Sequence, residues 1–498
     1  MKKGEIYDGV IDHIDYPNRG IICLDEGIVQ VKNGIPGQKV RVQIQKKRSN
    51  KAEARLLEVL EASPLETRKP VCSAFPACGG CTYQTMDYES QLRMKEEQIR
   101  SLLTDAVRQD QSAFPDDQRT FIWDGILGSP EEFGYRNKME FSFGNEVKDG
   151  PLTLGLHRKG STYDVLETGD CALVHRDLDT VLACVLSFCR ETGLPHFHKG
   201  NHQGYFRHLL VRCSAAMGEI LIHLVTSSQA DLDLTPLVQK LLALKLEGRI
   251  VGILHLINDS LADVVQSDRT ELLWGRDWFY ERLMGLTFKI TSFSFFQPNS
   301  LAAELLYRRV LEYANQYIIR DNKKAPLVYD LYSGTGTITQ LLASSVAREA
   351  VGVELVEEAV EAARENTLLN NLSNCHFIAG DVLKILDDLV EKPDIIVLDP
   401  PRDGIHPKAL PKILSYQVDY IIYISCKASS LVRDLPAFFG AGYRLERACA
   451  VDQFCQTPHV ETVCLLGRRK PDDTIKVSVN MDDYYQIRDA EEAEKNPS

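Results

Sequence analysis

The chain has 498 residues, of which 44% are apolar and 26% charged, proportions that exclude a fibrous repeat or a wholly disordered chain. Its length suggests about three domains, and its formal net charge of −13 argues against nucleic-acid binding by charge alone. No apolar run approaches the ~20 residues that cross a bilayer, and MKKGEIYDGV lacks the apolar core of a secretory signal, so we expect a cytoplasmic protein with no membrane partner.

Residues 5–60 alternate five short β-rich runs with turn signals such as YPNRG and NGIPG. This pattern predicts a small β-barrel over residues 1–60. The same segment holds 11 Lys or Arg against 8 Asp or Glu, so a polyanion should meet this end of the chain first. The basic run from Lys46 to Arg48 lies between the last two β-rich runs, where we expect an exposed hairpin loop.

The next segment, residues 61–84, is rich in Pro, Gly and Cys, and Cys72, Cys78 and Cys81 form C-x5-C-G-G-C. In a reducing compartment clustered thiols bind metal rather than form disulfides. Four thiolates suit a zinc ion or a four-iron cluster, so a fourth ligand is required, and Cys171 in TGDCALVH is the candidate. The scattered cysteines are expected to be packing residues: Cys23, Cys184, Cys189, Cys213, Cys375, Cys449 and Cys464.

A helix is expected in YESQLRMKEEQIRSLL, and mostly alternating patterns follow from Gly134 to residue 296. We therefore expect a central α+β domain over residues 61–296 that includes the cysteine segment. From Pro326 onward, buried-type strands such as LVYDLYSG and DIIVLDPP alternate with helical segments, which predicts a doubly wound parallel sheet over residues 297–470. The acidic end, residues 471–498, is expected to be a mobile tail. The whole is a multidomain α/β protein.

In YDLYSGTGT a strand enters a turn in which Gly334 and Gly336 let the backbone approach a ligand. Glu354 ends the next strand, where Rossmann-like folds place a carboxylate on ribose hydroxyls, and Asp381 ends a third strand. The turn lacks the third glycine of a dinucleotide site, so a nucleoside without phosphates fits better. With the Asp399-Pro-Pro that ends the fourth strand, the pattern resembles the S-adenosylmethionine-binding fold of class I methyltransferases.

Three blocks follow in order, DPPR, ISCKASSLVRDL and DQFCQTPHVET. Their order resembles the RNA uracil-5-methyltransferases, and the likeness extends to SFFQPN and GYRNKMEFSF, so that it covers residues 1 to about 468. The resemblance implies that Cys426 is the nucleophile, that Glu461 is the base, and that S-adenosylmethionine is the methyl donor. The positions at which the family contacts its donor correspond here to Gln297, Tyr332, Glu354 and Asp399.

The chemistry explains these residue types, because C5 of uracil is too weak a nucleophile to accept a methyl group unaided. A thiolate that adds to C6 creates an enolate, C5 then takes the methyl group, and a base removes the C5 proton so that the thiol can leave. A thiol has a pKa near ~8.5, so positive charge nearby would help, and Lys427 and Arg433 are the candidates. Two departures concern loop conformation: the family often has Asn or Asp followed by Pro where this chain has Lys427-Ala428, and Phe-Pro where it has Phe454-Cys455.

The resemblance also implies an RNA-binding TRAM domain, an OB-like barrel, at the N-terminus and a [4Fe-4S] cluster on the four cysteines, with zinc as the alternative. Both features point to 23S ribosomal RNA with an unpaired or flipped uridine. Aromatic residues that could stack on the base are Phe295, Phe296, Tyr332 and Phe454. The rival interpretations are a tRNA uridine or RNA cytosine C5 methyltransferase and a non-catalytic RNA-binding ribosome assembly factor. Nothing implies a protein partner.

Overall fold

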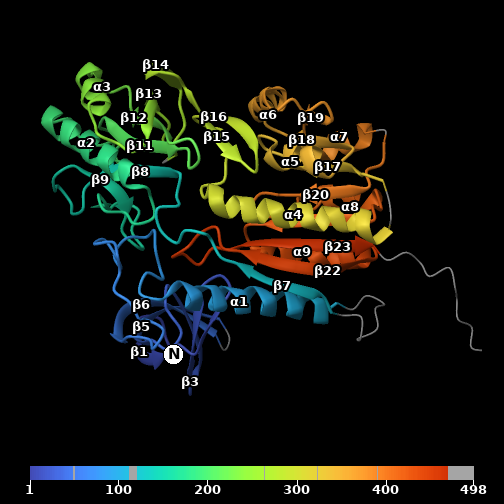
Figure 1. Ribbon diagram of the computed structural model, residues 1–498. Coiled ribbons are helices and arrows are strands. Elements are labelled where there is room, and N and C mark those ends of the chain that lie inside the picture. Colours follow the sequence, from blue (N-terminus) through green and yellow to red (C-terminus); the bar gives the residue numbers. More distant parts are fainter. Residues whose placement is uncertain (49–50, 111–119, 263, 322–323, 390, 469–498) are drawn as a thin grey trace, which may run out of the picture.

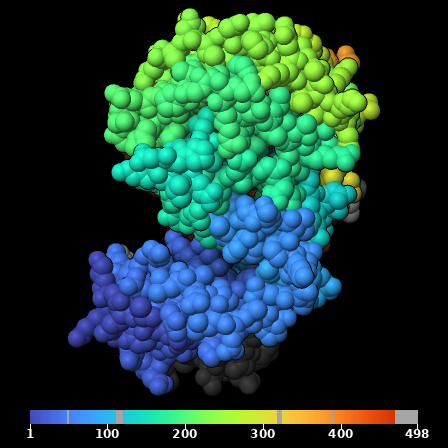
Figure 2. Space-filling model, turned by 90° about the vertical axis from the view of Figure 1, so that its left-hand side faces the viewer, coloured from blue at the N-terminus to red at the C-terminus, as the bar shows by residue number. Residues whose placement is uncertain are grey.

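The computed structural model describes residues 1–48, 51–110, 120–262, 264–321, 324–389 and 391–468. The expected acidic tail lies outside these residues. Three sheets carry most of the fold (Figure 1), and Figure 2 shows the N-terminal lobe and the central lobe as separate masses joined by the chain that follows the N-terminal sheet. Among the described residues, none of the helices combines the length and the apolar character that crossing a membrane demands.

The N-terminal sheet has six strands in the order β1-β5-β6-β4-β3-β2. They are β1 (Ile6–Val10), β2 (His13–Asp15), β3 (Arg19–Leu24), β4 (Gly27–Lys32), β5 (Lys39–Arg48) and β6 (Lys51–Glu61). Alternate residues such as Val29, Val31, Val40 and Val42 face inward and form its core. A methyl group added at Gly9 would lie 2.5 Å from a carbon of Ile22, so the sheet curls until β1 meets β3.

Two expectations for this segment change. The sequence predicts five strands, and the additional strand, β2, has three residues and is too short to show a period. The expected loop with the basic run is part of β5 instead, since Lys46 pairs with Glu53 and Lys47 with Ala52. The closed barrel of a TRAM domain stays a prediction, because β1 and β2 form the two ends of the sheet.

The central sheet has seven strands in the order β10-β9-β8-β11-β12-β13-β14. Its elements are β8 (Lys138–Gly144), β9 (Thr153–His157), β10 (Val165–Glu167), α2 (Arg176–Thr192), β11 (Phe206–Cys213), β12 (Glu219–Thr226), α3 (Thr235–Leu242), β13 (Arg249–Ile257) and β14 (Arg269–Gly275). Leu178, Val181 and Val185 of α2 pack with Leu209 and Ile222 of the sheet. Neighbouring strands are antiparallel except β12 and β13, which α3 connects.

The third sheet has eight strands in the order β19-β18-β17-β20-β21-β23-β22-β7. The elements of this part are α1 (Tyr88–Arg108), β7 (Ile122–Leu127), the hairpin β15 (Trp278–Leu283) and β16 (Leu286–Thr291), α4 (Ser300–Asp321), β17 (Leu327–Leu331), α5 (Thr337–Ser345), β18 (Glu349–Glu354), α6 (Glu357–Leu369), β19 (Cys375–Ala379), α7 (Val382–Asp388), β20 (Ile395–Leu398), α8 (Ala409–Ser415), β21 (Tyr420–Ser425), α9 (Ala428–Gly440), β22 (Tyr443–Val451) and β23 (Glu461–Arg468). Strands β19, β18, β17, β20 and β21 are mutually parallel, which confirms the doubly wound pattern.

Helices cover both faces of this sheet, and alternate residues of each strand enter different cores. Val328 packs with α4 and α5 on one face, whereas Leu327 and Tyr329 pack with α8 and α9 on the other. Because each strand is buried on both faces, it reads as a continuous apolar run rather than as an alternation.

Residues 88–127 depart from the domain division expected from the sequence. The helix α1 places Ile99, Leu103 and Val107 in the core of the eight-stranded sheet, and β7 pairs in parallel with β22 at the edge of that sheet. The helix α1 and the strand β7 belong with the eight-stranded sheet although the central sheet follows them in the chain (Figure 1). The sequence analysis missed this because nothing in the sequence of a six-residue edge strand such as β7 indicates which strand it pairs with.

Candidate active site

A cleft of about 1230 Å³ lies along the carboxyl ends of the parallel strands. This is the edge at which open α/β sheets bind their ligands. The expected site residues that line the cleft are Gln297, Tyr332, Gly334, Glu354, Asp381, Asp399, Cys426 and Glu461. They come from the ends of β17, β18, β19, β20 and β21, from the start of β23, and from the segment before α4.

One end of the cleft is built around the glycine turn after β17. Tyr332 and Gly334 have φ angles of 70° and 55°, a left-handed conformation that bends the chain sharply. The Glu354 carboxylate accepts hydrogen bonds from the backbone N–H groups of Gly334 and Val356, each at 3.0 Å. The turn and the carboxylate therefore hold each other in place at the mouth of a nucleoside-sized space.

Gly336 has a different role from the one expected. It does not line the cleft, and a methyl group added there would lie 2.3 Å from the Phe377 ring. It begins α5 with a φ of 77°. Its hydrogen side chain therefore permits close packing of α5 on β19 rather than ligand contact.

The other residues expected to contact the methyl donor lie in different environments. Asp381 is exposed and its carboxylate accepts a hydrogen bond from Leu383 N at 2.9 Å, which caps α7. Burial raises the pKa of Asp399 to about 7. Gln297 is buried, and its backbone carbonyl oxygen accepts a hydrogen bond at 3.0 Å from the side-chain amide of Asn137, which lies just before β8.

Arg212 is a positioning residue that the sequence analysis missed. It is 2% exposed in β11, and its guanidinium donates to the carbonyl oxygens of Thr291, Ser292 and Ser294 at 2.6, 3.0 and 2.9 Å. A buried guanidinium that binds the carbonyl oxygens of residues 291, 292 and 294 fixes the backbone of the cleft wall. The central sheet thereby shapes the site.

Cys426 and Glu461 come together because of strand register. Strands β21 and β23 are antiparallel, and Ser425 pairs with Thr462. The residue after Ser425 and the residue before Thr462 therefore lie at the same edge, where both line the cleft. Cys426 is partly exposed, whereas Glu461 is 3% exposed.

The electrostatics of the pair favour the protonated forms. Burial, Glu461 and Asp399 raise the pKa of Cys426 to about 11, against which Arg402 acts through its charge and a hydrogen bond. Burial and Asp399 raise the pKa of Glu461 to about 8, and Arg402 again opposes the shift. The Glu461 carboxyl is therefore suited to exchange a proton near neutral pH, whereas Cys426 needs nearby positive charge to form its thiolate.

The positive charge at the thiol comes from Arg402, not from the expected Lys427 or Arg433. The Arg433 guanidinium is bound instead to the Asp434 carboxylate at 3.0 Å and to the Asp403 carbonyl oxygen. Arg402 directly follows the DPP motif, but the reach of its side chain toward Cys426 could not be read from the chain.

The model of the tRNA (uracil-5-)-methyltransferase family matches residues 260–469. An RNA methyltransferase of Clostridium acetobutylicum is 45% identical over 469 residues, which cover 94% of this chain and 99% of that protein. One of Clostridium tetani is 43% identical over 470 residues, with 94% and 99% covered. The chain belongs to a family of RNA methyltransferases. Its fold also matches the tRNA (uracil-54, C5)-methyltransferase of Pyrococcus abyssi, solved with S-adenosyl-L-homocysteine, with a TM-score of 0.69, 24% identity, and 92% and 100% of the two chains covered.

The aromatic residues expected to stack on the base all line the cleft but differ in exposure. Phe296 is buried against Phe288, with ring centroids 6.1 Å apart. Phe293 and Phe295 are 53% and 67% exposed and line the cleft. Exposed rings at the mouth of a cleft are suited to stack on an unpaired base, and Phe293 was not among the residues expected to do so.

Cys455, which lies six residues before Glu461 in the sequence, does not line the cleft. Cys455 is fully buried, and its thiol donates to the Tyr88 hydroxyl at 3.4 Å within the core that packs on the central sheet. It is a packing residue. Among the scattered cysteines, Cys23 is exposed rather than packed, and the remaining six are buried or partly buried.

The four cysteines expected to bind metal are all buried, and they belong to two segments far apart in the chain. Cys72 and Cys81 both act on Cys171 to raise its pKa, after burial, which has the largest effect, so these thiols face one region. The Gly80 N–H donates to the Cys78 sulfur at 3.4 Å. Within the described ranges, no group of three or more His, Cys, Asp or Glu side chains is placed to hold a metal ion.

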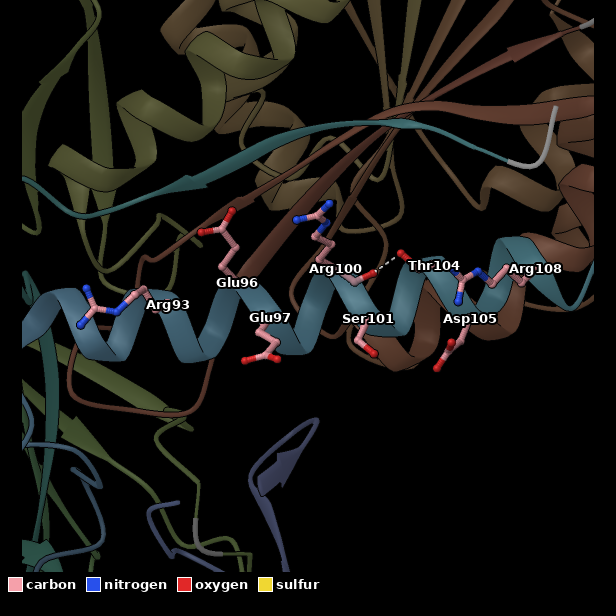
Figure 3. A pocket seen from close by; sticks show the side chains of 8 residues that line it. All are labelled: Arg93, Glu96, Glu97, Arg100, Ser101, Thr104, Asp105 and Arg108. Carbon is pink, nitrogen blue, oxygen red and sulfur yellow. Dashed lines mark hydrogen bonds between the residues drawn. The ribbon is translucent and has the colours of Figure 1, made fainter. Parts of the chain in front are cut away.

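A second hollow, of about 510 Å³, runs along α1, and its lining carries three arginines and three carboxylates (Figure 3). Figure 3 shows Glu96 and Arg100 pointing toward β7, while Glu97 and Asp105 point away. Glu96 accepts a hydrogen bond from the Trp123 indole at 2.7 Å. Opposite charges in equal number give this face no preference for a charged ligand, and it is separate from the catalytic cleft.

Proposed function

We propose that this RNA methyltransferase transfers a methyl group from S-adenosylmethionine to C5 of a uridine in RNA. The observation that carries the proposal is the pairing of Cys426 with Glu461 across β21 and β23, in one cleft with the glycine turn and Glu354. A nucleophile, a base and a nucleoside-binding turn are the three parts that the reaction requires.

Cys426, once its thiol proton has passed to solvent at this partly exposed position, adds as the thiolate to C6 of the uracil ring, and the electrons of the C5–C6 double bond move to C5 and O4. C5 then accepts the methyl group, Glu461 removes the C5 proton, and expulsion of the Cys426 sulfur restores the double bond. Arg402 favours the thiolate that forms during attack. The buried position of Glu461 excludes water from the proton that it removes.

The bound methyl donor supplies an electrophilic methyl group. Glu354 would hold its ribose hydroxyls, and Gly334 and Tyr332 would let its nucleoside approach the backbone. Asp381, Asp399 and Gln297 complete the wall of the same space. The carboxylates of this part of the cleft suit a nucleoside with a positively charged sulfonium.

We propose 23S ribosomal RNA in the cytoplasm as the substrate, with the uridine turned out of its stack so that Cys426 reaches C6. The TRAM-like N-terminal sheet and the cysteine segment support this choice within the family. The family model and the Pyrococcus abyssi enzyme carry tRNA in their names, which favours tRNA as the second candidate.

Mass-spectrometric nucleoside mapping tests the proposal directly. RNA from cells with and without this protein is digested, and 5-methyluridine is located in the separated ribosomal and transfer fractions. We expect one or more 5-methyluridines in 23S RNA to disappear. Loss from tRNA alone would replace the substrate, and loss of 5-methylcytidine would replace the reaction.

The release of the C5 proton should depend on pH through Glu461. The pKa of this carboxyl is raised to about 8, and only the ionised form acts as a base. Measured per covalent adduct formed, so that the titration of Cys426 does not enter, release should increase as the pH rises and level off above 8. Between pH 6.5 and 8.5 we expect an increase of roughly 20-fold. RNA carrying tritium at uridine C5 reports the step as tritium released to water, and a flat profile would contradict the assignment.

We propose that the four buried cysteines hold a [4Fe-4S] cluster that ties the segment after β6 to the central sheet. Four thiols and a backbone N–H aimed at the Cys78 sulfur fit such a group. The segment makes few regular hydrogen bonds of its own, and a cluster would replace the missing core. Zinc is the alternative occupant of the same thiols.

Exchange of Cys81 for serine should release the cluster. Protein purified without oxygen is expected to contain about four iron atoms per chain and to absorb visible light, and Cys81→Ser should lose both signals. Cys23→Ser, which changes an exposed cysteine of the N-terminal sheet, serves as the control and should retain them. One zinc ion per chain in place of iron would overturn the cluster assignment.

A further inference from the structure

Tyr16 connects the N-terminal sheet to the catalytic loop. It lies in the turn between β2 and β3, is partly buried, and packs against the core on the α9 face of the catalytic sheet. Its hydroxyl oxygen accepts a hydrogen bond from the Ala428 N–H at 3.0 Å, across 412 positions of the chain. Ala428 is two residues after Cys426.

The first turn of α9 needs such a partner. The backbone N–H groups that begin a helix have no acceptor within it. A Ser, Thr, Asp or Asn side chain before the helix normally serves the second or third of them, so the first N–H, here that of Ala428, needs an acceptor from elsewhere. Here Lys427 holds that position and makes no side-chain cap hydrogen bond. Ala428 is fully buried, so water does not replace the cap. Tyr16 therefore caps α9 from another part of the molecule.

The turn that carries Tyr16 is itself held. The Tyr83 hydroxyl, in the segment after the cysteines, donates to the Asn18 side chain at 3.2 Å, and both residues are buried. The Asn18 N–H donates to the Asp15 carbonyl oxygen at 2.9 Å, which closes the turn. The Tyr16 hydroxyl is consequently placed by the N-terminal sheet and the cysteine segment together.

The Tyr16 hydroxyl faces the charged groups of the site without lining the cleft. Burial raises the pKa of Tyr16 to about 12, and Glu461 and Cys426 add to the shift, while the bond from Ala428 and the charge of Arg402 oppose it. The group thus stays a neutral hydroxyl at working pH. It acts on the site through the Ala428 backbone and not by touching a reactant.

We propose that Tyr16 is a positioning residue for the nucleophile: it fixes the first turn of α9, and so the place of Cys426 beside Glu461. The N-terminal sheet is then part of the catalytic unit in addition to any role in binding RNA. The inference rests on the proposed reaction for its purpose. The reactivity of the Cys426 thiol tests it without RNA or a methyl donor.

Tyr16→Phe removes the acceptor and keeps the ring. We measure the alkylation rate of Cys426 across a pH series by mass spectrometry of the peptide that contains it, and we expect this rate to change by at least about threefold. We also expect kcat of methylation to fall about tenfold, with KM changed by no more than about twofold. The matched control is Tyr7→Phe, since the Tyr7 hydroxyl of the same sheet donates to Glu5 and Glu26 at the surface at 2.8 and 2.7 Å. The control should leave both readouts unchanged.

A second measurement separates positioning from general damage. Thermal unfolding should show Tyr16→Phe and Tyr7→Phe both folded at the assay temperature, since each loses hydrogen bonds of a single hydroxyl. A change in Cys426 reactivity confined to Tyr16→Phe then reports the position of the thiol and not a loss of structure.

Equal thiol reactivity in Tyr16→Phe and Tyr7→Phe would overturn the inference. If no RNA is methylated by the wild-type protein, the proposed function fails, and the alkylation measurements still decide the role of Tyr16.

Discussion

Replacing Cys426 with alanine is expected to reduce methyl transfer to RNA by roughly 10⁴-fold or more while the fold persists. The covalent bond to C6 is what turns C5 into a nucleophile, so no other group in the cleft substitutes for the sulfur. Cys426 is partly exposed, and the lost volume leaves little buried cavity. Single-turnover transfer of a labelled methyl group from S-adenosylmethionine to RNA measures the effect, and thermal unfolding checks the fold.

Cys455→Ala is the matched control, because this thiol is six residues from Glu461 in the chain but lies in the core beside Tyr88. It should cost about 1 kcal/mol of stability and leave the rate within about twofold. Transfer by Cys426→Ala within about tenfold of the wild type would remove the covalent mechanism.

Exchange of Glu461 for glutamine should trap a covalent complex between protein and RNA. The amide has the shape of the carboxyl but cannot take up a proton, so Cys426 still attacks and methylation still occurs, while the C5 proton blocks expulsion of the sulfur. We expect the complex to survive denaturation and to migrate as a slower band on a denaturing gel. The mass and sequence of the RNA fragment attached to Cys426 identify the modified uridine.

Glu354→Gln provides the comparison for this experiment. Its carboxylate binds the glycine turn and faces the donor side of the cleft, so its loss should slow methylation without trapping RNA. A Glu461→Gln protein that methylates RNA and forms no covalent band would show that another group removes the proton.

Much of the methyltransferase part is predictable from sequence because the candidate site residues directly follow the apolar runs that form its strands. Glu354, Asp399 and Cys426 each close a buried apolar run, and parallel strands bring their carboxyl ends to one edge. Gly336 shows the limit of such logic. Its conformation is local and readable, but the reason for it, the ring of Phe377, comes from a strand about 40 residues later.

The unpredicted features all depend on long-range contacts. Arg402 reaches the thiol, Arg212 fixes the cleft wall from another sheet, and Tyr16 caps a helix across most of the chain. Each is an ordinary residue in an ordinary stretch, and only the assembled fold gives it a role. The single signal was the absence of a capping side chain at Lys427, which leaves a donor that something must satisfy.

The pairing of β7 with β22 means that the methyltransferase domain of this enzyme is not one continuous stretch of the chain. A fragment that starts at residue 297 would leave β22 as a bare edge, with a row of unpaired N–H and C=O groups open to other chains, and would uncover the apolar face that α1 protects. A chimera that transplants the catalytic half onto another RNA-binding module must carry residues 88–127 with it, and homologous recombination within the family should respect the same boundary.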